Sequence, residues 1–118
     1  MEDSPVRAKS YQFAVRTVRF CREVRDPTVR PLVSQLLRAG TSIGANVEEA
    51  RAAQSRKDFI AKMSIASKEA REACYWLRLL RDSGVAKEQD TNDLLLAAGE
   101  LTRILTAIVK TTRERDEP

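Results

Sequence analysis

The chain has 118 residues, of which 42% are apolar and 32% charged, with four Gly, four Pro and a formal net charge of +4. This length fits one domain, residues 1–118, whose core needs neither disulfides nor metal, and the low Gly and Pro content favours helices. The chain contains no His, which excludes the commonest general base and transition-metal ligand, together with Ser-His and Cys-His nucleophile pairs.

Membrane spans, export signals and cofactor sites are not visible in the sequence. No apolar run approaches the roughly 20 residues that cross a bilayer, and the acidic start lacks the apolar segment of a secretory signal. We therefore expect a cytoplasmic protein that is not an enzyme, with no cofactor and no small-molecule substrate. Cys21 and Cys74 have no metal-type spacing and lie beside apolar residues, so we expect reduced thiols in the core.

Four helical patterns separated by three short breaks predict an all-α fold, an antiparallel up-and-down four-helix bundle. Ser10, Thr28 and Ser55 are placed to cap the first three helices, and Gly84 is placed to end the third. The predicted helices cover about residues 10–25, 29–53, 56–83 and 87–112, and we expect frayed ends.

The first predicted helix has two apolar sides. At 100° per residue, Tyr11 and Val18 lie on one side, whereas Phe13 and Phe20 lie on another. A surface helix normally carries one apolar stripe that faces one core. We therefore expect one side to face the core of the bundle and the other side to face another subunit, and we assign Phe13 and Phe20 to the subunit interface.

The second predicted helix continues through two glycines. Two Gly within five residues usually indicate a loop, but Leu36, Gly40, Ile43 and Val47 keep one helical phase, with Gly44 at its edge. Each Gly costs about 1 kcal/mol relative to Ala in a helix. We therefore expect a neighbouring helix to approach closely at Gly40 and Gly44, the alternative being two incidental glycines in a loose helix.

One flank of the third predicted helix mixes large apolar groups with charges, a pattern typical of subunit interfaces. Its acids would need ion pairs across the interface, for which Arg22 or Arg38 could supply the cation. The alternative is that Trp76 only covers the edge of its own bundle. Glu69 and Glu72 do not indicate a metal site, since di-metal bundles add a His to such a pair. The candidate interface residues on this helix are Lys62, Ile65, Glu69, Glu72, Trp76 and Leu80.

A second stripe of the third helix is basic. Rows of Lys and Arg gain affinity for phosphates through counterion release, and Tyr can stack on an unpaired base. Such a stripe can also be a solvated face, and no helix-turn-helix, zinc or RNA-recognition motif is present. The candidate nucleic-acid contacts are Lys57, Lys68, Arg71, Tyr75 and Arg78, extended by Arg16 and Arg19 of the first helix.

The central stretch resembles a family of four-helix bundle proteins encoded in intervening sequences of bacterial 23S ribosomal RNA genes. The resemblance rests on GTSIGAN at residues 40–46, EA at 49–50, SxxDFIxK at 55–62, KEA at 68–70 and YWL at 75–77. It implies an up-and-down bundle that assembles into a ring-shaped homopentamer, without an established enzymatic activity. The family is also similar to the accessory protein of diversity-generating retroelements, a pentamer that binds nucleic acid and a reverse transcriptase.

These observations support two hypotheses. The first is a non-enzymatic homo-oligomer, a pentamer by the resemblance, that acts as an accessory protein for RNA or DNA. The alternative is a scaffold for protein–protein interaction that does not bind nucleic acid. Salt-dependent binding to structured RNA or DNA distinguishes the two.

Overall fold

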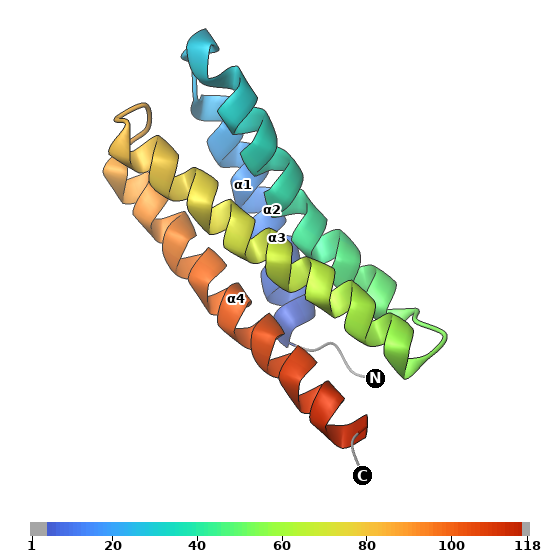
Figure 1. Ribbon diagram of the computed structural model, residues 1–118. Coiled ribbons are helices and arrows are strands. Elements are labelled where there is room, and N and C mark those ends of the chain that lie inside the picture. Colours follow the sequence, from blue (N-terminus) through green and yellow to red (C-terminus); the bar gives the residue numbers. More distant parts are fainter. Residues whose placement is uncertain (1–4, 117–118) are drawn as a thin grey trace.

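The computed structural model describes residues 5–116, which form four α-helices and one short 3-10 helix (Figure 1). The elements are α1 Pro5–Glu23, η1 Pro27–Val29, α2 Arg30–Arg51, α3 Arg56–Asp82 and α4 Glu88–Asp116. Successive helices run in opposite directions, and each helix contacts the two that flank it. Within the described residues α1 and α3 lie diagonally across the bundle, with no pair of their Cα atoms within 8 Å. The predicted up-and-down four-helix bundle is therefore confirmed.

The start of α1 and the break after it differ from the prediction. α1 begins at Pro5, a residue suited to the first helical turn, so Ser10 lies inside the helix instead of capping it. Ser10 is buried, and its hydroxyl donates to the carbonyl of Arg7 at 3.1 Å. The residue that caps η1 is Asp26, whose carboxylate accepts hydrogen bonds from the Thr28 hydroxyl at 2.7 Å and the Thr28 amide at 2.9 Å. These two bonds lower the pKa of Asp26.

The two ends of α3 follow the prediction. The Ser55 hydroxyl accepts a hydrogen bond from the amide of Asp58 at 3.0 Å, which makes Ser55 the N-cap. Gly84 has a φ of 76°, in the left-handed region that favours glycine at the end of a helix. α4 runs to Asp116, about one turn beyond its predicted end.

The core consists of large aliphatic residues separated by alanines. The alanines let α3 approach both of its neighbours, because a methyl group leaves room for the facing side chains. The apolar phase predicted for the second helix faces this core, since Leu36, Ile43 and Val47 are all buried. Its fully buried residues include Phe13, Leu36, Ala39, Ile43, Ala66, Ala70, Ala73, Leu77, Leu80, Ala98, Leu101 and Leu105.

The glycines of α2 mark where α1 packs most closely against it, and α2 is unbroken across both. A Cβ at Gly40 would lie 2.7 Å from Cγ2 of Thr17, a residue that is fully buried. A Cβ at Gly44 would lie 3.4 Å from the backbone oxygen of Ser10. We call this contact the glycine seam, and it fixes the antiparallel register of α1 and α2.

Candidate functional site

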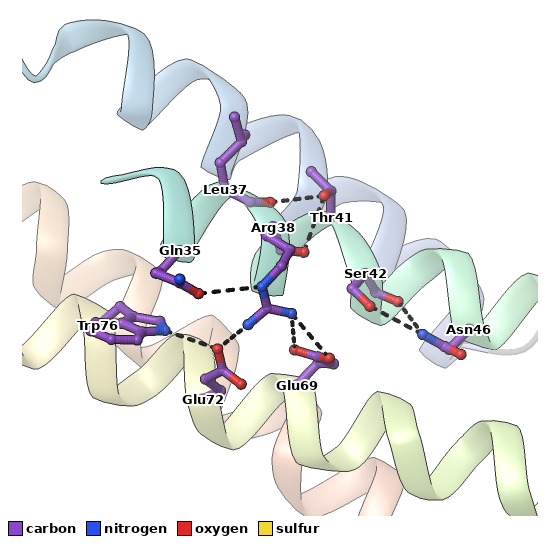
Figure 2. A network of polar contacts seen from close by, with 9 residues as sticks. All are labelled: Gln35, Leu37, Arg38, Thr41, Ser42, Asn46, Glu69, Glu72 and Trp76. Carbon is purple, nitrogen blue, oxygen red and sulfur yellow. Dashed lines mark hydrogen bonds and ion pairs between the residues drawn. The ribbon is translucent and has the colours of Figure 1, made fainter. Parts of the chain in front are cut away.

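Arg38 joins α2 to two carboxylates of α3 (Figure 2). Its Nη1 donates to Glu69 Oε1 at 3.0 Å and to Glu69 Oε2 at 3.2 Å, and its Nη2 pairs with Glu72. Glu72 also accepts a hydrogen bond from Trp76 Nε1 at 3.1 Å. On the other side, Arg38 Nε donates to Gln35 Oε1 at 3.4 Å. Arg38, one of the two cations expected to reach these acids across a subunit interface, instead pairs with them within one chain, and that alternative is wrong.

This network stabilises a buried charge. Glu69 is 8% exposed, whereas the side chain of Arg38 is 49% exposed. A buried carboxylate without a partner is costly, since it loses its hydration. Arg38 supplies two hydrogen bonds to that carboxylate and keeps part of its own guanidinium in water. The acids of this flank thus contribute to the α2–α3 contact of the chain itself.

Two residues assigned to the subunit interface lie in the core instead. Phe13 is 1% exposed and Leu80 is fully buried, so neither can contact another subunit. Phe20 is half-buried and packs against the same core. The predicted roles of the two apolar sides of α1 are therefore reversed, because the side with Phe13 and Phe20 faces the bundle.

The opposite side of α1 is the one left open. Tyr11 is 69% exposed and Val18 is 39% exposed. Leu37 of α2, the helix that packs against α1, is 38% exposed. We call Tyr11, Val18 and Leu37 the α1–α2 patch. The periodicity of α1 grouped Tyr11 with Val18, but only packing reveals which group of the two is covered.

On α3, the candidate interface residues still at the surface lie beside the Arg38 network. Ile65 is 38% exposed, and Lys62 and Trp76 are half-buried. Trp76 packs partly against the core and meets the ring of Tyr75 edge-on, with centroids 5.1 Å apart. Trp76 therefore covers the edge of its own bundle and also presents an edge to solvent.

The basic stripe of α3 is at the surface. Lys57, Lys68 and Arg71 are exposed and form no ion pair with any described carboxylate. Tyr75 is 50% exposed, and the guanidinium carbon of Arg78 lies 6.0 Å from the centre of its ring. An arginine at that distance contributes a cation–π contact. The stripe therefore offers cations and an aromatic face on one exposed side of α3.

Arg16 and Arg19 do not extend that stripe. They line a separate cavity of about 420 Å³ between the end of α1 and the start of α4, where they lie near Asp90 and Asp93. This cavity lies between α1 and α4, and no Cα atom of α1 comes within 8 Å of one of α3, so Arg16 and Arg19 are separated from the stripe.

The two cysteines are free thiols that pack against the core. Burial raises the pKa of Cys21 to about 11. Burial also raises the pKa of Cys74, although a hydrogen bond with Thr102 and the charge of Arg78 act in the opposite direction. Protonated thiols are poor nucleophiles, so neither cysteine is suited to nucleophilic catalysis.

Residues 5–116 show neither a metal-binding cluster nor a membrane-spanning helix. That part of the chain contains no group of three or more His, Cys, Asp or Glu side chains arranged to hold a metal ion. Of its helices, none combines the length and the hydropathy needed to cross a membrane.

Comparisons with known proteins agree with this architecture. The family model described as 23S rRNA-intervening sequence protein matches residues 2–107. A crystal structure at 1.70 Å resolution of a protein of unknown function, from the S23 ribosomal protein family of Bacteroides thetaiotaomicron VPI-5482, is similar with a TM-score of 0.84. The two chains are 42% identical, and the match covers 89% of this chain and 98% of that one. No curated protein matches the sequence. The chain belongs to the family of 23S rRNA-intervening sequence proteins.

Proposed function

We propose that this chain assembles into a ring of identical subunits, five by the family resemblance, and that the ring is a non-enzymatic accessory that binds RNA or DNA. The observation that carries the proposal is the basic stripe of α3. Its lysines and Arg71 have no carboxylate partner among the described residues, whereas the acids of the opposite flank, Glu69 and Glu72, both pair with Arg38. Unpaired cations in a row are what a phosphate backbone binds.

Self-association is supported by apolar groups on two different surfaces. The α1–α2 patch and the surface of α3 around Ile65 and Trp76 both present apolar groups to solvent in a single chain. A ring needs contacts between two unlike surfaces, because each subunit meets the next one head to tail. Two unlike apolar surfaces on one chain satisfy that requirement, whereas a single self-complementary patch gives a dimer.

Light scattering tests the assembly. We expect a mass about five times that of one chain, and a monomer at micromolar concentration would contradict the proposal. Leu37→Lys introduces a charge into the α1–α2 patch and should lower the mass without loss of helical circular dichroism. Leu96→Lys is the matched control, since Leu96 is 74% exposed on α4, outside both surfaces. If only the Leu96 variant lost mass, the ring would use α4 instead.

Binding to a structured RNA over a range of salt concentrations tests the nucleic-acid function. A triple Ala variant of Lys68, Arg71 and Arg78 should bind more weakly and lower the slope of log K against log salt by about one per lost phosphate contact. Its control is the triple Ala variant of Arg22, Arg25 and Arg30, which removes the same charge from exposed positions elsewhere. No binding by the unmodified chain at low salt would favour a protein scaffold.

A further inference from the structure

A groove between α3 and α4 has no role in the assembly or in the nucleic-acid binding proposed above. It has a volume of about 440 Å³, within the range of about 300 to 1,000 Å³ that is usual for small-molecule sites. The sequence carries no local sign of this groove, because its residues come from helices that are about 40 positions apart in the chain. It is lined by Ser64, Ser67, Arg71, Thr106, Val109, Lys110, Arg113 and Glu114.

The hydroxyl groups of this groove carry more donor protons than the hydrogen bonds between them use. Arg71 Nη1 donates to Ser67 Oγ at 3.0 Å, and Ser67 Oγ lies 3.1 Å from Thr106 Oγ1. The two hydroxyls carry two protons, and their mutual bond uses one of them. The Oγ of Ser64 is buried and has no hydrogen-bond partner among residues 5–116. Most buried polar groups in proteins are paired, so an unpaired buried hydroxyl calls for an explanation.

The charges of the groove are also unbalanced. Arg71, Lys110 and Arg113 contribute three cations, and Glu114 contributes the one carboxylate of the lining. Neither Lys110 nor Arg113 forms an ion pair with a described residue. The groove therefore combines spare hydroxyl donors with spare positive charge, and both are complementary to an oxyanion with several acceptor oxygens.

We infer that the α3–α4 groove binds a phosphate group, with Arg71, Lys110 and Arg113 around its charge and with the hydroxyls of Ser64 and Thr106 donating to its oxygens. The phosphate can be free inorganic phosphate or a phosphodiester of a polynucleotide, and the second source rests on the proposed function. Arg71 belongs both to the groove and to the basic stripe. A bound phosphodiester would therefore continue the path of a strand that lies along α3.

Thermal unfolding with inorganic phosphate tests the groove without nucleic acid. At constant ionic strength, phosphate in place of chloride should raise the midpoint of the unmodified chain by about 3 °C or more near saturation. The double variant Lys110→Gln with Arg113→Gln should lose this shift. The control, Lys57→Gln with Lys68→Gln, removes the same charge from the exposed stripe and should keep it. A shift that is absent from the unmodified chain, or equal in both variants, would overturn the inference.

Ser64→Ala tests the site with a substitution that leaves the charge of the groove unchanged. Removing an unpaired buried hydroxyl should raise the midpoint without phosphate and reduce the additional shift that phosphate produces. Equal phosphate shifts in the variant and the unmodified chain would exclude Ser64 from the site and contradict the inference as stated.

RNA binding by the same two double variants distinguishes the source of the phosphate and separates the two proposals. If both variants lose affinity, a phosphodiester occupies the groove. If only the Lys57/Lys68 control loses affinity for RNA, and phosphate stabilises neither the unmodified chain nor the variants, the groove inference fails while the proposed function stands. If phosphate stabilises the chain and RNA does not bind at low salt, the proposed function fails and the groove binds free phosphate.

Discussion

α1 and α2 meet through the glycine seam, whereas α3 and α4 are joined by hydroxyls beside an open groove. In the seam, Gly40 leaves room for nothing larger than a hydrogen atom against Thr17. Between α3 and α4, Ser67 and Thr106 meet at 3.1 Å, and the space beside them amounts to about 440 Å³. One bundle thus contains a contact whose buried hydroxyls are paired and a contact with spare donors beside an open groove. The first pair of helices serves the fold, and the second pair leaves a space available to a ligand.

The seam is expected to be the more sensitive of the two contacts. Gly40→Ala should lower the free energy of unfolding by about 2 kcal/mol, because the overpacking of a buried site outweighs the gain in helix propensity of about 1 kcal/mol. Urea unfolding followed by circular dichroism measures the loss. Thr17→Ala in the same chain should restore part of it by removing the methyl group that the new Cβ meets.

Gly44→Ala is the matched control for that substitution. Its Cβ would lie 3.4 Å from the Ser10 oxygen, which is tight but does not require a rearrangement. The gain in helix propensity should nearly cancel the cost, and we expect a change within about 0.5 kcal/mol. Equal losses for the two alanine variants would mean that Thr17 does not limit the approach of α1.

The sequence predicted the seam better than the groove. The phase of Leu36, Ile43 and Val47 continued across both glycines, and such periodicity is local information. The two apolar sides of α1 were both visible, but only contact with α2 and α4 decides that Phe13 is the covered one. The groove depends on hydroxyls of two helices that become neighbours only after packing, and Ser in a helix carries no periodic signal.

Ion pairs between residues far apart in the chain also could not be predicted from the sequence. Arg38 is 31 positions from Glu69 in the chain, and charged residues at that separation can form many alternative pairs. The sequence identified both the acids and the cation but placed their contact between subunits. The bundle geometry decides instead that α2 and α3 are neighbours within one chain.

The Arg38 network connects the helix of the seam to a helix of the groove, and its removal should have the next largest effect. Arg38→Ala leaves the buried carboxylate of Glu69 without its cation. Charge-assisted hydrogen bonds contribute about 1.5–3 kcal/mol, and because Arg38 is half-exposed, solvent screening reduces this to about 1.5 kcal/mol. Chemical unfolding checks the value.

Lys9→Ala is the control for the loss of Arg38. Lys9 pairs with Glu100 at 3.2 Å, and both side chains are more than 40% exposed. An exposed pair contributes little, so we expect less than about 0.5 kcal/mol. If the two variants lost the same stability, the burial of Glu69 would not matter for the α2–α3 contact.

The hydroxyl contact of the groove should have a smaller effect on stability than either of these. Thr106→Val removes the partner of Ser67 at nearly constant volume and should cost about 0.5–1 kcal/mol, the net value of one hydrogen bond. Thr111→Val, on an exposed position of α4, should change nothing measurable. A double-mutant cycle with Ser67→Ala measures the interaction free energy of the two hydroxyls. A value near zero would show that they contribute independently to stability.

The reactivity of the two cysteines reports on the α1–α2 and α3–α4 contacts separately, and it can be measured at a pH where stability does not change. The thiol of Cys21 lies 3.9 Å from the carbonyl of Val33 on α2, and Cys74 faces Thr102 on α4. With a pKa of about 11, about 0.1% of Cys21 is thiolate at pH 8, whereas a thiol of ordinary pKa near 9 would be about a tenth ionised. Since Thr102 and Arg78 oppose the effect of burial, Cys74 should react faster with iodoacetamide.

Rates measured by mass spectrometry on the variants Cys21→Ala and Cys74→Ala, each of which retains one thiol, test this order. Equal rates would contradict the difference in electrostatics between the two contacts.

The raised pKa of Cys21 also makes a prediction for alkaline pH, because a pKa raised by folding means that the folded chain holds its proton more tightly. Below about pH 9 the protonated Cys21 contributes its full stability, and between about pH 9 and 11 that contribution is lost as the unfolded thiol ionises first. The Cys21→Ala variant should therefore lose less stability than the unmodified chain over that window.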